Sequence, residues 1–211
     1  MFGWLRRRRR SAPRDTDAAA RAALLAVLDL DHDRAEQLLV ASAELDSTDV
    51  EPYFALARFY RMRGDIGRAI RLHQILLLRS DLDPEQRTTC LADLAADFRQ
   101  GGFLQRAIAS YEEVLERDPR HATALRALVP LLADARDHPR ALAMQRRLAA
   151  VERRDASAEQ AQLCVDMAEA AQAEGRTRDA WRAIRRAIRA DENSVRAWIL
   201  LGQLEAERGR S

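Results

Sequence analysis

The chain has 211 residues, 47% of them hydrophobic, so it can bury a substantial core in one elongated array or in one to two compact domains. All 35 basic residues are arginine, which excludes phosphate-binding loops and Schiff-base chemistry that need a lysine. Six arginines lie in residues 1–14, where there is no acid, and the other 29 face 33 acids, so a basic nucleic-acid-binding face is not expected.

Residues 1–14, MFGWLRRRRRSAPR, form a basic segment that we expect to be flexible and separate from the rest of the chain, residues 15–211. An apolar tip followed by an arginine run is typical of peripheral attachment to an anionic membrane surface. The alternatives are a disordered tail or the trimmed start of a longer parent chain. The expected membrane-contact residues are Phe2, Trp4, Leu5, Arg6, Arg7, Arg8, Arg9 and Arg10.

The stretch from Val50 to Arg79 predicts a helical hairpin. Apolar and small residues recur there at steps of three and four on two successive segments, and Gly64 and Asp65 separate the segments. The positions on the first segment are Tyr53, Leu56, Ala57 and Tyr60, and those on the second are Ala69, Leu72, His73 and Leu76.

The same hairpin can be traced along the chain by the small residue that opens each second helix, at spacings of 34, 38, 34 and 39 residues. Two helices can cross closely only where a side chain is short. The positions are Ala35, Ala69, Ala107, Ala141 and Ala180. The turn positions are Leu30, Gly64, Gly102, Arg136, Gly175 and Gly209. Four of the six are glycine, which suits a helix end that needs a left-handed residue.

This order of residues resembles the tetratricopeptide repeat, whose period is about 34 residues. The resemblance implies an all-α fold, a right-handed superhelical solenoid of about five helical hairpins followed by a single terminal helix. Asp83 and Ser157 are expected to cap helices, with Gln86 and Gln160 completing capping boxes, and Pro130 is expected to bend a first helix. The terminal helix, with Trp198 and Ile199, is apolar for a cap, so we expect self-association there or truncation from a longer chain.

No cofactor, metal or catalytic motif is found, so we expect no cofactor and no enzymatic activity. Cys90 and Cys164 lie in helical apolar patterns and are interpreted as buried thiols, and His73 as a hydrogen-bonded core residue. No apolar run is long enough for a transmembrane span, and only five residues precede Arg6, too few for a signal-peptide core. A cytoplasmic location is expected.

The first helices of such an array line its concave side, and several residues there lie off the packing stripe. An arginine-lined groove with an aromatic anchor fits an acidic or amphipathic peptide of a protein partner. The alternative is that the arginines pair with neighbouring acids and do nothing more. The candidate groove residues are Phe54, Arg58, Arg61, Arg99, Arg126 and Arg196.

A more specific resemblance lies in the run RMRGDIGRAIRLHQ (Arg61 to Gln74), the linker LDPEQR (Leu82 to Arg87) and the segment ENSVR (Glu192 to Arg196). These are similar to the lipopolysaccharide assembly protein B family, bacterial inner-membrane proteins with tetratricopeptide repeats. The resemblance implies a scaffold that helps a membrane protease to control lipopolysaccharide synthesis. Members also carry an N-terminal transmembrane helix and a rubredoxin-like metal domain, and this sequence shows neither.

The sequence therefore favours a non-catalytic adaptor for protein partners, acting in lipopolysaccharide or cell-envelope homeostasis at the cytoplasmic face of the inner membrane. One alternative is a generic tetratricopeptide assembly module with an unrelated partner. The other is an enzyme with an active site in the groove, which would require converging acid, base and nucleophile groups.

Overall fold

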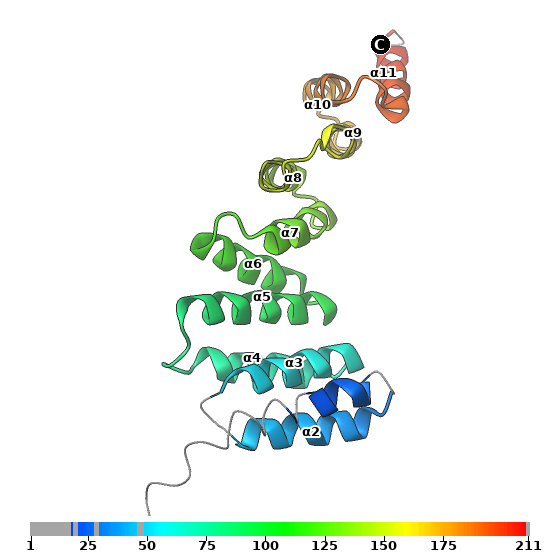
Figure 1. Ribbon diagram of the computed structural model, residues 1–211. Coiled ribbons are helices and arrows are strands. Elements are labelled where there is room, and N and C mark those ends of the chain that lie inside the picture. Colours follow the sequence, from blue (N-terminus) through cyan, green and yellow to red (C-terminus); the bar gives the residue numbers. More distant parts are fainter. Residues whose placement is uncertain (1–17, 19–20, 28–29, 46–48, 210–211) are drawn as a thin grey trace, which may run out of the picture. The chain divides into compact units, whose positions relative to one another are not determined.

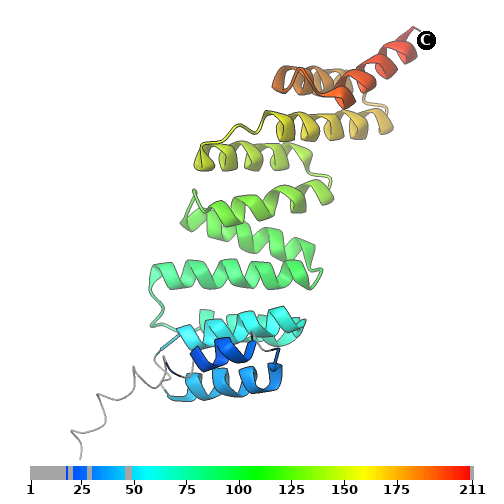
Figure 2. The ribbon, with the colours of Figure 1, turned by 45° about the vertical axis from the view of Figure 1, so that its right-hand side comes forward.

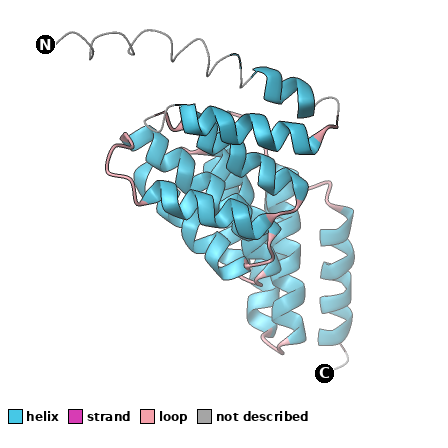
Figure 3. Ribbon diagram, turned by 90° about the horizontal axis from the view of Figure 1, so that it is seen from below, coloured by secondary structure: helices cyan, strands magenta, loops and turns pink. Residues whose placement is uncertain are grey.

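The computed structural model describes residue 18 and residues 21–27, 30–45 and 49–209, and this part of the chain consists of helices and loops without a strand (Figures 1 and 3). The all-α prediction is confirmed. The basic segment, residues 1–14, lies outside the described residues, and so do the eight residues expected to contact a membrane. Among the described helices, none combines the length and the apolar character that crossing a bilayer requires.

The chain divides into two compact units, residues 1–110 and 111–211. In the first unit, residues 21–27 are helical, and the hairpin predicted from Val50 to Arg79 is formed by α3 and α4 (Figure 2). α2 packs against α3, and α5 packs against α4. The helices of this unit are α2 (His32–Leu45), α3 (Glu51–Arg63), α4 (Ile66–Leu77) and α5 (Pro84–Gln100), and α6 (Leu104–Arg117) begins in it.

The second unit repeats the hairpin arrangement. α7 packs against α8, α9 packs against α10, and α11 lies against both α9 and α10. Pro130 lies inside α7, and the helix continues through it to Asp134. The helices that lie wholly within this unit are α7 (Ala122–Asp134), α8 (His138–Glu152), α9 (Ser157–Ala173), α10 (Thr177–Ala190) and α11 (Val195–Arg208).

The small residues that open the second helices are fully buried, as the sequence predicts. A methyl group at these positions lets the backbone of the neighbouring helix approach closely, whereas a larger side chain would force the pair apart. The residues with no exposed surface are Ala35, Ala69, Ala107, Ala141 and Ala180. The hairpins are therefore held by close helix crossings at regular positions of the sequence.

The turns follow the predicted pattern in all but one case. Gly64 ends α3 with φ of +86° in the left-handed region, which residues with a side chain rarely adopt. Leu30 and Arg136 occupy the equivalent place without being glycine, at a cost of roughly 1 kcal/mol each. Gly209 has φ of −74°, so the prediction of a left-handed turn after α11 is wrong. The described positions with positive φ are Leu30, Gly64, Gly102, Arg136, Arg153 and Gly175.

One of the two predicted capping boxes is present. The carboxylate of Asp83 accepts a hydrogen bond from the backbone N–H of Gln86 (2.8 Å), and the Gln86 side chain accepts one from the backbone N–H of Asp83 (3.1 Å). The box predicted at Ser157 is wrong. Ser157 lies inside the first turn of α9, and its backbone N–H donates to the carboxylate of Asp155 (2.9 Å).

Candidate partner-binding site

Two of the candidate groove arginines connect α3 to α5 through ion pairs in the first unit. The guanidinium of Arg58 lies 2.7 Å from the carboxylate of Asp93. Arg61 lies 2.9 Å from the carboxylates of both Asp93 and Asp97. The pairing is possible because three- and four-residue steps place each pair on one face of its helix. Their charges are used within the fold, as the alternative interpretation of the groove expects.

The deeper part of this network is fully buried. Asp97 has no exposed surface, and its second carboxylate oxygen lies 2.6 Å from Nδ1 of His73, which is equally buried on α4. The interpretation of His73 as a hydrogen-bonded core residue is confirmed. Burial favours the neutral form of Asp93, but hydrogen bonds from Arg58 and Arg61 outweigh burial and keep the pKa of Asp93 below its usual value.

The prediction of Phe54 as an exposed aromatic anchor is wrong. Its side chain is 2% exposed and packs in a core cluster with Val50, Leu76 and Cys90. Phe54 and Arg58 do share one helix face, and the guanidinium carbon lies 5.9 Å from the ring centroid. Phe54 is covered although Arg58, one turn further along the same face, is half-exposed, so spacing on the helix alone could not show which of the two faces solvent.

The remaining candidate groove arginines differ from one another. Arg126 forms an ion pair with Glu152, and Arg196 pairs with Asp166 (2.9 Å) and Glu169 (2.6 Å). The side chain of Arg99 is exposed and forms no hydrogen bond or ion pair with another residue of the described ranges. Within its own unit, Arg99 is thus the candidate that keeps an uncompensated charge at the surface.

Neither of the two cysteines, Cys90 and Cys164, is a reactive thiol. Cys90 and Cys164 are both unpaired and buried, as the sequence analysis expects. Burial raises the pKa of Cys90 to about 12 and also raises the pKa of Cys164, so both remain protonated at neutral pH.

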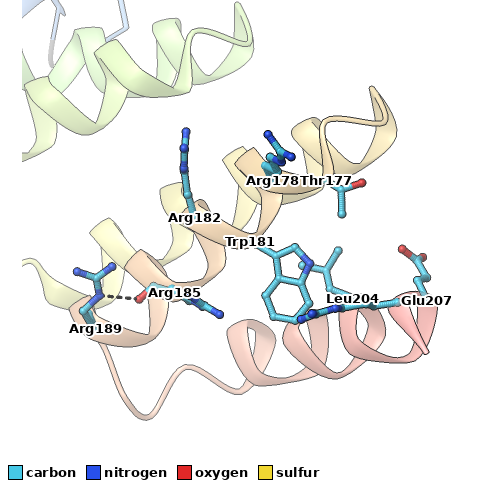
Figure 4. Close-up of a pocket in the computed structure, with 9 residues that line it drawn as sticks. Thr177, Arg178, Trp181, Arg182, Arg185, Arg189, Leu204 and Glu207 are labelled. Carbon is cyan, nitrogen blue, oxygen red and sulfur yellow. Dashed lines mark hydrogen bonds between the residues drawn. The ribbon is translucent and has the colours of Figure 1, made fainter. Parts of the chain in front are cut away.

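A cleft that the sequence analysis did not identify lies between α10 and α11 in the second unit (Figure 4). Its volume is about 720 Å³, within the size range of ligand-binding pockets. Trp181 points from α10 toward α11, and the arginines of the lining come mostly from α10, where Arg178 and Arg182 point away from α11 (Figure 4). The lining residues are Thr177, Arg178, Trp181, Arg182, Arg185, Arg189, Leu204, Glu207 and Arg208.

Four of these arginines form a line that we call the arginine row: Arg178, Arg182, Arg185 and Arg189. Their spacing of four, three and four residues places them on one face of α10. The buried face lies opposite and consists of Ala180, Ala183, Ile184 and Ala187. The arginine row therefore points away from the core and lies on the solvent-facing side of α10.

The arginine row is poorly neutralised. Its one recorded ion pair to a carboxylate among the described residues, Arg182 to Asp179, is 3.5 Å long, and the side chain of Arg182 is 81% exposed. Arg185 stacks over the ring of Trp181 at 5.6 Å, and Arg189 donates to the backbone carbonyl of Arg185 (3.2 Å). These contacts orient guanidinium groups without cancelling their charge.

A signal for this site was present in the sequence. The segment TRDAWRAIRRAIRA holds five arginines and one acid, and its apolar residues keep to one helix face. The candidate groove residues lie on the first helices of the hairpins, whereas α10 is a second helix. Glu207, the acid of the cleft lining, accepts a hydrogen bond from Gln172 (2.8 Å).

The outer face of α11 is apolar and exposed. Val195 is 70% exposed, Trp198 52% and Ile199 57%, while Leu200 and Leu204 on the other side are buried. Gly202 on the exposed face has open space where a side chain would stand. Gly202 is at the position of the repeat that Ala57 occupies in an earlier hairpin, where it is fully buried. The face that is buried on that earlier first helix is therefore exposed on α11.

Helical hairpins that cross at regularly spaced small residues and end in left-handed turns define a helical-repeat protein, and the chain has the tetratricopeptide-repeat fold. A similar solved structure is the C-terminal part of a tetratricopeptide-repeat protein from Cytophaga hutchinsonii, with a TM-score of 0.65 and 15% sequence identity. The match covers 88% of this chain and 73% of that chain. No protein-family model matches the chain.

The sequence is also similar to one particular protein. It is 25% identical to lipopolysaccharide assembly protein B of Escherichia coli K12 over 99% of this chain and 55% of the relative. The protein of the same name from Haemophilus influenzae is 25% identical over 76% of this chain and 41% of the relative. The predicted resemblance is confirmed, and the chain spans about half the length of the relatives that it matches.

The buried network predicts a large difference between two substitutions. In Asp97→Ala, the partly buried Arg61 and the fully buried His73 lose their shared carboxylate, so the free energy of unfolding should fall by about 3–5 kcal/mol. In Arg58→Ala, which removes a half-exposed partner, it should fall by about 1 kcal/mol or less. Urea unfolding followed by circular dichroism measures both, and equal effects would contradict the structural role of Asp97.

Proposed function

We propose that the chain is a non-catalytic scaffold that binds other proteins in lipopolysaccharide or cell-envelope homeostasis, at the cytoplasmic face of the inner membrane. The observation that carries this proposal is the similarity to lipopolysaccharide assembly protein B along 99% of the chain. The similarity includes the hairpins of both units, so it bears on the repeat array as a whole and not on a single motif.

The surface of the described residues supports a binding role. Exposed apolar residues on α11 and the poorly neutralised arginine row on α10 lie on neighbouring helices at the end of one unit. Patches of this kind mark places where another macromolecule binds. Of the predicted groove residues, Arg99 stays a proposed contact with its whole charge. Arg58, Arg61, Arg126 and Arg196 would contribute only through groups left over from their ion pairs.

Partner capture tests the scaffold. The full chain, immobilised and incubated with lysate of its native host, should retain a defined set of proteins, and envelope or lipopolysaccharide enzymes should be enriched among them. Mass spectrometry against a bare-matrix control identifies the set. Specific capture of proteins from unrelated processes would favour the generic assembly module, and capture of nothing above the control would contradict the scaffold.

The basic segment is proposed as a peripheral membrane contact. Five consecutive arginines should contribute about 1 kcal/mol each near an anionic surface. The full chain should co-sediment with phosphatidylglycerol vesicles, and a variant lacking residues 1–14 should not. Neutral phosphatidylcholine vesicles are the control, and equal sedimentation of the two proteins with anionic vesicles would contradict this part of the proposal.

Self-association through α11 is also proposed. Along its outer face, Val195, Ile199, Gly202 and Ala206 follow steps of four, three and four, as in an antiparallel helix pair. In such a pair, Ile199 of one copy faces Gly202 of the other, a large side chain against a small one. Sedimentation velocity should show a mass that rises with concentration, and Ile199→Asp should abolish the rise. A concentration-independent monomer in the unsubstituted chain would contradict this contact.

A further inference from the structure

We propose that the arginine row of α10 is a binding site for an acidic protein segment in extended conformation, with carboxylates on alternate residues. This inference rests on the proposal that the chain binds a protein partner, and it adds the place and the chemistry of one contact. It concerns a second helix of a hairpin, whereas the groove predicted from the sequence belongs to first helices.

The charge of the row requires a negatively charged occupant. Several arginines of the second unit outside the row have carboxylate partners at 2.6 to 3.2 Å, such as Arg196 with Glu169 and Arg140 with Asp137. The row has one pair at 3.5 Å, and for Arg178 no partner is recorded among the described residues. Guanidinium groups bind carboxylates through two parallel hydrogen bonds, so the row offers donors that the fold leaves available.

The length of the row favours an extended anion over a single small one. From Arg178 to Arg189 the helix rises about 16 Å, at roughly 1.5 Å per residue. One phosphate ion can contact only a fraction of that length. In an extended peptide, side chains on one side repeat every 6.6 Å or so, close to the roughly 6 Å rise between arginines four residues apart. The middle pair of the row, three residues apart, rises only about 4.5 Å, so three carboxylates spanning about 13 Å would lie along the row without one facing every arginine.

Trp181 and Glu207 define how the segment lies. The ring of Trp181 stands beside the row and carries Arg185 on its face, so it offers an apolar surface to a neighbouring side chain of the peptide (Figure 4). The α11 side of the cleft holds Glu207 beside Arg208, whereas the α10 side holds four arginines, so carboxylates should lie nearer to α10. The segment should follow α10 along the row, with one apolar residue directed toward Trp181.

A concave site suits a peptide better than a bilayer. The cleft is formed between two helices, and a flat lipid surface could reach its rim but not Trp181 between them. An anionic membrane is therefore the competing occupant, and the experiment below includes it.

The test uses the full chain and a fluorescein-labelled peptide of alternating aspartate and alanine with one central leucine. Fluorescence anisotropy should show binding that weakens with added salt, and replacing the aspartates by asparagines should abolish it. The double variant Arg182→Glu/Arg185→Glu should bind at least about tenfold more weakly. Equal binding of the aspartate and asparagine peptides would overturn the proposal.

A matched control separates the row from overall charge. Arg71→Glu/Arg120→Glu makes the same change in net charge at two exposed arginines outside the row and the predicted groove, and it should leave the affinity within about twofold. Arg182→Gln/Arg185→Gln should show an intermediate loss, and circular dichroism should be unchanged in all three because the substituted side chains lie outside the core. Equal weakening by the control variant would overturn the site.

Two further results distinguish the alternatives. If the unsubstituted chain bound phosphatidylglycerol vesicles through the row but did not bind the peptide, the occupant of the row would be a membrane surface and not an acidic segment. A native partner captured equally by the unsubstituted chain and by Arg182→Glu/Arg185→Glu would refute this site as its contact and leave the scaffold proposal intact. Absence of any captured partner, with peptide binding present, would count against the scaffold and not against the row.

Discussion

The close crossing of helices at fully buried alanines is the constraint on which the rest of the structure depends. Each hairpin has one such residue at the start of its second helix, and the larger side chains fill the space that the crossing leaves. Because the crossing fixes which face of each helix is covered, it also fixes which face is left for binding. On α10 that division is sharp, with Ala180, Ala183 and Ala187 on one side and the arginine row on the other.

The features that sequence reasoning could predict are those set by short-range geometry. The period of the repeat, the positions of the turns and the small residues at helix crossings follow directly from the spacing of residues in the sequence. Ala69 is buried and Gly64 is in a left-handed turn, as that spacing predicts. The burial of Phe54 could not be read in this way. The same three- and four-residue steps that put Phe54 beside Arg58 are compatible with a covered face or an open one, and only the neighbouring hairpin decides between them.

The candidate site was harder to predict for a related reason. The local sequence around an arginine does not show whether an acidic residue of a distant helix will form an ion pair with it. Asp93 lies 32 residues after Arg61, and the pair meets only because α5 packs close to α3. The arginine row could have been recognised from the sequence, because its own helix supplies a single acid, Asp179. One carboxylate within the helix cannot neutralise several arginines.

Arginines that form ion pairs between helices and arginines of the exposed row differ in how freely they can change during evolution. Arg61 is tied to three helices through Asp93, Asp97 and, beyond them, His73, so a change of partner specificity there would disturb folding. The arginine row lies on the face of α10 opposite its buried residues, so it can gain, lose or shift charges one at a time. A lineage could therefore retune what this helix recognises while the architecture beneath it stays unchanged.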